Sequence, residues 1–148
     1  MTKPPTTYEV QAHTESGGDA SVEVANQTGP IDARWAADEP SGLPGPAELL
    51  AAAFAACLMK NMERSGAMMR FDYDRADIDV TARRQDKPPK FVEIEYEVRI
   101  VTDEDQRRIE LLHRNLRQFG TVYNTLAAVC DVHGRIVPIA RSADRARD

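Results

Sequence analysis

The sequence predicts an α+β fold, because strand-like and helix-like segments are grouped rather than alternating regularly along the chain. Residues 20–26 and 92–100 alternate apolar with polar side chains, which indicates strands with one packed face and one wet face. Residues 49–59 are an almost unbroken apolar run without Gly or Pro, which predicts a helix. Because this helix is apolar on every side, we expect it to be buried all round. A sheet should cover one of its faces and a second chain another.

Composition restricts the class of protein. The 148 residues fit one domain, spanning residues 1–148. The formal net charge of −5 argues against a nucleic-acid partner, which would need a basic patch. The apolar run of about 11 residues is too short to cross a membrane, which takes about 20. Residues 1–7 lack the apolar core of a secretory signal, so we expect a cytoplasmic protein with reduced Cys57 and Cys130.

The N-terminal third predicts strands followed by the central helix. Residues 7–13 and 20–26 read as strands joined by a tight turn. Residues 27–30 are expected to turn the chain into a short segment at 31–35, before a loop rich in Gly and Pro. The helix then begins at Pro46, a first position that Pro favours, and ends near Gly66.

The remaining elements predict a sheet with covering helices. Residues 77–82 and 92–100 read as an antiparallel pair joined through 87–90. Thr102 is expected to cap a second helix that Gly120 ends, with residues 103–105 supplying acids to its first turn. We expect a short helix at 122–129, a last strand at 134–139, and a frayed end at 140–148.

The helix and its surroundings resemble one known family. Residues 45–57 read Gly-Pro-Ala-Glu-Leu-Leu-Ala-Ala-Ala-Phe-Ala-Ala-Cys. This run resembles the Asn-Pro-Glu-Glu-Leu-Leu-Ala-Ala-Ala signature of the OsmC/Ohr family, which continues through small residues to a reactive cysteine. Residues 122–126, Val-Tyr-Asn-Thr-Leu, also resemble the family's segment before its final strand. The resemblance covers nearly the whole chain and implies an intertwined homodimer, with two central helices wrapped by antiparallel sheets.

The resemblance also implies a chemistry, that of a thiol peroxidase acting on organic hydroperoxides. In the family, a first cysteine attacks the peroxide and becomes a sulfenic acid, and a second cysteine closes a disulfide that an external dithiol reopens. Cys57 matches the first cysteine. Gly120 occupies the position of the second, and Cys130, ten positions later, is not assumed to replace it. We therefore expect an external thiol to reduce Cys57 directly.

The family's glutamate and arginine match only in part. Ala47 stands at the glutamate position, and Glu48 is one position away. Nine helical residues at about 100° each put Glu48 roughly opposite Cys57. Glu48 is a candidate catalytic residue, but it also suits the exposed N–H groups at a helix start.

Arg34 matches the arginine of OsmC-type members and is the candidate cation. It could instead stack on the neighbouring Trp35. Helical spacing also puts Asn61 and Arg64 on the stripe of Cys57. A cation near a thiol lowers its pKa, but a solvated helix end is the other interpretation of Arg64.

Two functions remain open from the sequence. The first is a peroxidase in which Cys57 reacts with a small hydroperoxide and an external thiol. The second is a non-catalytic homodimer that binds an apolar ligand and uses Cys57 for packing. No cofactor or metal is expected, since Cys130 and His133 form a lone Cys-x-x-His pair, while structural zinc takes four ligands.

Overall fold

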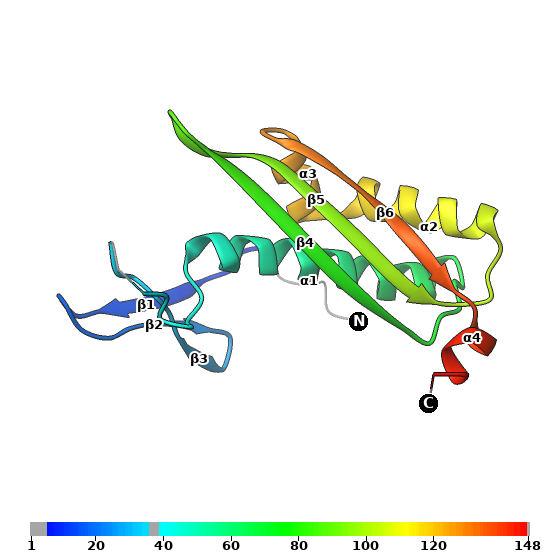
Figure 1. Ribbon diagram of the computed structural model, residues 1–148, viewed down its shortest axis with the longest axis horizontal. Helices are drawn as coiled ribbons and strands as arrows, with labels where there is room; N and C mark the ends of the chain where they lie inside the picture. Colours follow the sequence, from blue (N-terminus) through cyan, green and yellow to red (C-terminus); the bar gives the residue numbers. More distant parts are fainter. Residues whose placement is uncertain (1–5, 36–38, 148) are drawn as a thin grey trace. The chain divides into compact units, whose positions relative to one another are not determined.

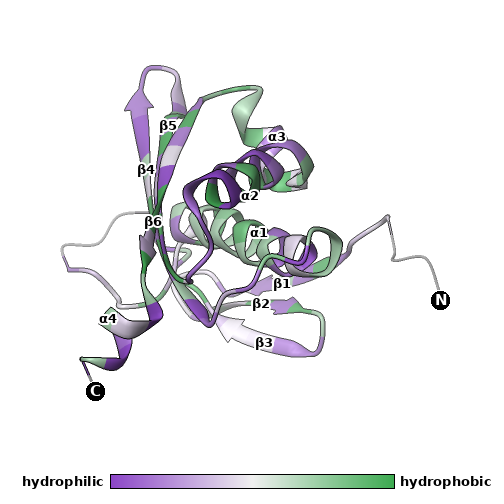
Figure 2. Cartoon of the chain, turned by 90° about the vertical axis from the view of Figure 1, so that its right-hand side faces the viewer, coloured by the Kyte–Doolittle hydropathy of each residue, from purple (hydrophilic) through white to green (hydrophobic). Residues whose placement is uncertain are grey.

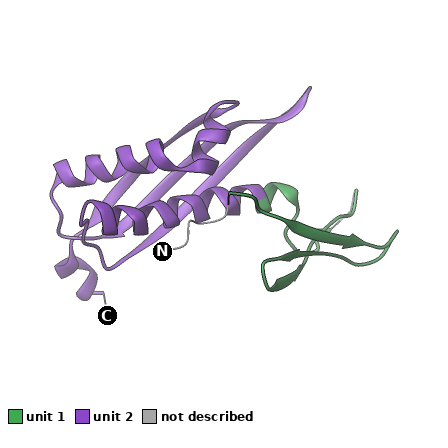
Figure 3. Ribbon diagram, turned by 180° about the vertical axis from the view of Figure 1, so that it is seen from behind, with its two compact units in different colours: residues 1–49 green, residues 50–148 purple. Residues whose placement is uncertain are grey.

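The computed structural model of the protein describes residues 6–35 and 39–147. Residues 1–5, 36–38 and 148 lie outside the described residues, and they include most of the segment assessed for a secretory signal. The chain forms two compact units, residues 1–49 and residues 50–148 (Figure 3). One domain over residues 1–148 stays a prediction. Among the described residues, no helix combines the length and apolar character needed to cross a membrane.

The first unit contains a three-stranded antiparallel sheet in the order β1-β2-β3. Its strands are β1 (Val10–Thr14), β2 (Ala20–Val24) and β3 (Gln27–Pro30). The predicted placement of a turn at 27–30 and a segment at 31–35 is wrong, because residues 27–30 are themselves the third strand. The turn is tighter than expected, since Ala25 adopts a positive φ of 54° and reverses the chain at once.

Helix α1 (Pro46–Met68) starts in the first unit and continues through the second. Pro46 is its first residue, as predicted. The helix does not end at Gly66, because a glycine inside a helix costs only about 1 kcal/mol and the backbone bonds continue past it. The buried side of α1 carries Phe54, Leu58, Met62 and Ser65. Within one chain the helix is not buried all round, since Ala52, Ala56 and Met59 are exposed.

The second unit contains a three-stranded sheet of β4 (Arg75–Asp86), β5 (Pro89–Val101) and β6 (Asp131–Ile139). The antiparallel pair β4–β5 confirms the alternation read from the sequence. Strand β6 runs parallel to β5, so this sheet is mixed rather than purely antiparallel as predicted. Strand β6 begins at Asp131, three residues before the predicted start at residue 134. Gly134 lies opposite Tyr96, and a β-carbon there would collide with the Tyr96 carbonyl and ring.

Helices α2 (Gln106–Phe119) and α3 (Thr121–Ala127) connect β5 to β6. The N-cap of α2 is Asp105, whose Oδ1 accepts a hydrogen bond from the Arg108 amide at 2.9 Å. The prediction of Thr102 as the cap is wrong. Its hydroxyl instead donates to the Asp72 carbonyl at 2.6 Å, which fixes the end of β5.

Helices α1, α2 and α3 lie on one face of the β4-β5-β6 sheet (Figure 1, Figure 2). Their apolar sides meet the sheet in one core, whose largest fully buried side chains include Phe54, Leu58, Met62, Ile94, Ile100, Leu112 and Leu116. This arrangement is an α+β fold, as the sequence predicts. It places the middle of α1 beside the junction of α2 and α3.

Residues 140–147 are ordered rather than frayed, which corrects the prediction for this part of 140–148, while residue 148 lies outside the described residues. Residues Arg141–Arg145 form helix α4. Arg75 of β4 donates to both carboxylate oxygens of Asp144, at 2.7 and 2.5 Å. The Arg141 Nε donates to Asp74 Oδ1 at 3.1 Å, and its backbone amide donates to Asp103 Oδ1 at 3.0 Å. These partners lie far away in the sequence, so the local pattern gave no sign of them.

Candidate functional site

Cys57 lies on α1, at the boundary between its buried and exposed sides, and is half-buried. The Asn61 side chain, one turn further along, donates to the Cys57 carbonyl at 2.9 Å and reaches its Sγ at 3.6 Å. Neither Cys57 nor Cys130 forms a disulfide. The predicted stripe therefore brings an amide N–H to the sulfur, and such a donor stabilises a thiolate more than a thiol.

Gly120 packs directly against the Cys57 sulfur. A β-carbon at residue 120 would lie 3.1 Å from Cys57 Sγ, 2.8 Å from Tyr123 Cβ and 3.1 Å from the Leu116 carbonyl oxygen. The position that the family resemblance gives to the second cysteine is thus beside Cys57 in space. Even a methyl group does not fit there unless the junction of α2 and α3 moves.

Cys130 has a different environment. Its Sγ lies 3.1 Å from the Leu126 carbonyl oxygen, to which the thiol donates. Burial raises the pKa of Cys130, and the charge of Asp131 raises it further. A thiol in this state is a poor nucleophile at neutral pH. Cys57 is therefore the better candidate for a reactive cysteine.

Arg64 contacts the segment that leads into Gly120. Its guanidinium carbon lies 4.0 Å from the centre of the Phe119 ring, which is a cation–π contact. Arg64 is half-buried, and its interpretation as a solvated helix end stays a prediction. The role of Phe119 was not predicted, because no sequence pattern links the end of α2 to α1.

An aromatic cluster lies behind the site. The Tyr96 hydroxyl is 2.6 Å from His113 Nε2 and 3.5 Å from the Tyr123 hydroxyl, and the Phe54 ring packs on both tyrosines. Burial raises the pKa of Tyr96 and lowers the pKa of His113, with Arg117 lowering the latter further. Both groups are therefore neutral at pH 7. No sequence pattern links the members of this cluster, which come from α1, β5, α2 and α3.

Arg34 lies in the first unit, where Asp32 holds it. The Asp32 carboxylate accepts from the Arg34 backbone amide at 3.0 Å and from its Nε at 3.3 Å. Hydrogen bonds from Arg34 and Ser41 lower the pKa of Asp32 to about 2. The two residues line a cavity of about 510 Å³ within this unit. Trp35 is fully exposed, and the Arg34 guanidinium pairs with the carboxylate.

Glu48 also lies in the first unit, at the start of α1. Its Oε2 accepts a hydrogen bond from the Gly45 backbone amide at 3.2 Å. This contact is the helix-capping interaction given as the alternative interpretation of Glu48. The catalytic roles of Arg34 and Glu48 stay predictions, because they lie in one unit and Cys57 lies in the other.

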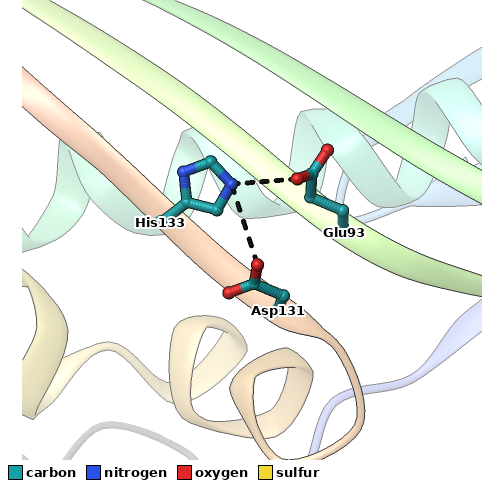
Figure 4. A group of neighbouring side chains, drawn as sticks. All are labelled: Glu93, Asp131 and His133. Carbon is teal, nitrogen blue, oxygen red and sulfur yellow. Dashed lines mark hydrogen bonds and ion pairs between the residues drawn. The ribbon is translucent and has the colours of Figure 1, made fainter.

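One set of side chains on the open face of the sheet could offer metal ligands (Figure 4). His133 Nε2 lies 3.1 Å from Glu93 Oε2 and 3.9 Å from Asp131 Oδ2. Arg83 is hydrogen bonded to the same Glu93, and the hydrogen bond from His133 lowers the pKa of Glu93 more than Arg83 does. Cys130 is not part of this set. Because cations of the protein itself already neutralise Glu93, we assign these residues to an ion-pair network.

Comparison with known protein families identifies the family of this chain. The sequence profile of the family described as OsmC-like protein matches residues 39–133. The chain belongs to the OsmC-like family. The match includes α1 with Cys57, the β4–β5 pair, and the α2–α3 junction with Gly120. No curated protein matches the OsmC-like chain in sequence.

Solved structures confirm the OsmC-like fold. An OsmC-like protein from Mycoplasma pneumoniae superposes with a TM-score of 0.78 at 16% identity, covering 91% of this chain and 97% of its own. An organic hydroperoxide resistance protein OsmC from Legionella pneumophila gives 0.70 at 17% identity, over 91% and 99%. The organic hydroperoxide resistance protein OhrB of Bacillus subtilis gives 0.66 at 19% identity, over 88% and 97%.

Proposed function

We propose that this OsmC-like protein reduces organic hydroperoxides through Cys57, with an external thiol as the reductant. The observation that carries the proposal is the pairing of a free, half-buried Cys57 with the Asn61 amide, beside the backbone of Gly120. The Legionella and Bacillus proteins of the same fold are named as organic hydroperoxide resistance proteins, which supports this class of substrate.

The cycle uses one cysteine. The Cys57 thiol and ROOH give a sulfenic acid, Cys57–SOH, and the alcohol ROH. An external thiol R′SH then condenses with the sulfenic acid, forming a mixed disulfide and releasing water. A second R′SH attacks that disulfide, restores the Cys57 thiol and leaves R′SSR′. Gly120 supplies no sulfur to compete with the external thiol, and a reducing cytoplasm, the expected location, would supply it.

Arg34 and Glu48 are the proposed partners of this chemistry from the first unit. Arg34 would stabilise the Cys57 thiolate, and Asp32 would hold the guanidinium in a fixed orientation. Glu48 would act through the start of α1, which its carboxylate caps. Arg34→Lys tests the arginine, since it keeps a charge but loses the planar pairing with Asp32.

A homodimer is the second part of the proposal. Ala52, Ala56 and Met59 form an exposed apolar stripe on α1. In the first unit, Tyr8 and Val10 are 79% and 64% exposed. A second copy would cover these surfaces, and small side chains on α1 allow two helices to approach closely. Ala56→Arg should therefore shift the protein from dimer to monomer in sedimentation velocity, while Ala127→Arg, on the exposed side of α3, should leave its mass unchanged.

Peroxide turnover tests the proposal directly. Reduced protein is mixed with cumene hydroperoxide and mercaptoethanol, and peroxide loss is followed with time. Cys57→Ser should abolish turnover, and Cys130→Ser should retain it. Dimedone should add to Cys57 alone after one equivalent of peroxide. No turnover together with a Cys57 that dimedone never labels would reject the peroxidase and favour the non-catalytic apolar-ligand protein.

A further inference from the structure

Arg64 provides a cation that contacts Phe119, the residue next to Gly120. It lies two helical turns after Cys57 on one side of α1, and helical side chains lean toward the N-terminus, here toward Cys57. Phe119, whose ring holds the guanidinium, directly precedes Gly120, and Gly120 packs on the Cys57 sulfur. The Phe119 contact therefore holds this charge next to Gly120, which also lies beside the Cys57 sulfur.

The Arg64 guanidinium has an aromatic partner but no acidic one. It forms no ion pair with any carboxylate in residues 6–35 and 39–147. The adjacent acid, Glu63, instead accepts a hydrogen bond from the Tyr73 hydroxyl at 2.6 Å. The guanidinium carbon lies over the Phe119 ring, and a guanidinium carries five N–H donors in its plane. These donors match the two oxygens of a carboxylate.

We infer that Arg64 binds a carboxylate at this site, and that the external thiol acting on Cys57 is an acidic one. This inference rests on the proposed function for its physiological meaning. A thiol that bears a carboxylate would pair with Arg64 and direct its sulfur toward Cys57. Phe119 is a positioning residue here, because it acts through its contact with the Arg64 guanidinium.

Disulfide exchange tests the inference without any peroxide. In the Cys130→Ser protein, the Cys57 thiolate attacks an aromatic disulfide, forms a mixed disulfide and releases one coloured thiolate. The probes are dithiobis(nitrobenzoate), which carries carboxylates, and neutral dithiodipyridine. The measured quantity is the ratio of their second-order rates. Arg64→Gln should lower this ratio about fivefold, the effect of one exposed charge pair.

Two further variants make the result specific. Lys60→Gln removes a positive charge that is closer to Cys57 in the sequence than Arg64 is. Within the described residues Lys60 makes no aromatic contact, so its substitution should change the ratio by less than Arg64→Gln. Phe119→Leu should lower the ratio while leaving the dithiodipyridine rate unchanged. An unchanged ratio in Arg64→Gln, or equal losses in Arg64→Gln and Lys60→Gln, overturns the inference.

A turnover assay separates this inference from the proposed function. With cumene hydroperoxide, mercaptopropionate should support faster turnover than mercaptoethanol, and Arg64→Gln should remove the difference. Turnover that shows no preference for the acidic thiol retains the peroxidase and rejects the carboxylate site. A charge-dependent exchange ratio without any peroxide turnover retains the site and rejects the peroxidase.

Discussion

The sulfur of Cys57 lies beside Gly120, because a β-carbon on residue 120 would be 3.1 Å from it. In a disulfide, the β-carbon of one cysteine lies roughly 3 Å from the sulfur of the other. The chain thus keeps the spacing of a two-cysteine site while holding a glycine there. Tyr123 and Leu116 occupy the space that a side chain at residue 120 would need. Because this position supplies no second sulfur, we expect the chemistry at Cys57 to use an external thiol.

Gly120→Ala should destabilise the protein by about 1–3 kcal/mol, as overpacking does in a filled core. The new methyl group would meet Tyr123 Cβ at 2.8 Å, and this atom is too close to the backbone to turn aside. Urea unfolding followed by circular dichroism measures the change. Gly29→Ala is the matched control, since nothing lies within 4 Å of its β-carbon position. Equal stability of the two variants would contradict the packing described at Gly120.

Gly66→Ala should act in the opposite direction and stabilise the protein by about 0.5–1 kcal/mol. Gly66 lies inside α1, and a β-carbon there would lie 3.6 Å from the Phe71 carbonyl, an ordinary contact. The same urea titration reports the change. A loss of stability would mean that α1 ends at Gly66, as the sequence alone predicts.

Asn61→Ala should lower the rate at which iodoacetamide alkylates Cys57 at pH 7 by about fivefold, the effect of one hydrogen bond of about 1 kcal/mol. The physical reason is the loss of the amide donor at 3.6 Å from Sγ. Asn115→Ala removes a comparable amide, which donates to Met69 Sδ at 3.2 Å, and should leave the rate unchanged. Equal rates in all three proteins would remove Asn61 from the site.

His113 should make the protein less stable as the pH falls below 6.5. Burial and the charge of Arg117 lower the pKa of His113 in the folded protein below its ordinary value of 6.5. As the pH falls, His113 therefore binds a proton in the unfolded chain before it does so in the folded protein, and protonation stabilises the unfolded state. His133 acts in the opposite direction, because Glu93 raises its pKa. The measurement therefore compares melting temperatures of wild type and His113→Gln between pH 7 and pH 5. Parallel curves would show that His113 does not contribute.

Asp144 should make the attachment of α4 sensitive to acid. Arg75 lowers the pKa of this carboxyl below its ordinary value of 3.8, so its contribution is complete above about pH 4. It is lost as the pH falls through the folded pKa. The hydrogen-exchange protection of residues 141–145, relative to free amides at the same pH, should fall at pH 3 in the wild type and already at pH 7 in Asp144→Asn. Continued protection in that variant would show that other contacts hold α4.

The sequence predicted the elements whose signal is local. The Ala-rich run gave α1, alternation gave the β4–β5 pair, and helical spacing brought Asn61 to Cys57. Elements that depend on distant partners were misread. Gly134 was predicted to start a strand. It lies in the middle of β6 instead, where the absence of a β-carbon leaves room for the Tyr96 ring. Thr102 was predicted to cap a helix, but its hydroxyl donates a hydrogen bond to the Asp72 carbonyl.

The site was predictable to the same degree. Cys57 and the equivalence of Gly120 came from the family resemblance, and the structure places them together. The contact between Arg64 and Phe119 joins residues 55 positions apart that share no motif, so only the packing of α2 on α1 reveals it. Glu48 lies one position from the family's glutamate and was therefore a catalytic candidate. In the structure its carboxylate accepts a hydrogen bond from the Gly45 amide and caps the helix.

The parallel pairing of β5 with β6 has a consequence for synthesis on the ribosome. Until residues 131–139 emerge, the backbone amides and carbonyls along one edge of β5 have no partner strand. Such an edge can recruit other nascent chains. Translational pausing before residues 131–139 have left the ribosome should therefore increase aggregation, and chaperones that bind nascent polypeptides should protect this protein mainly until β6 has paired with β5.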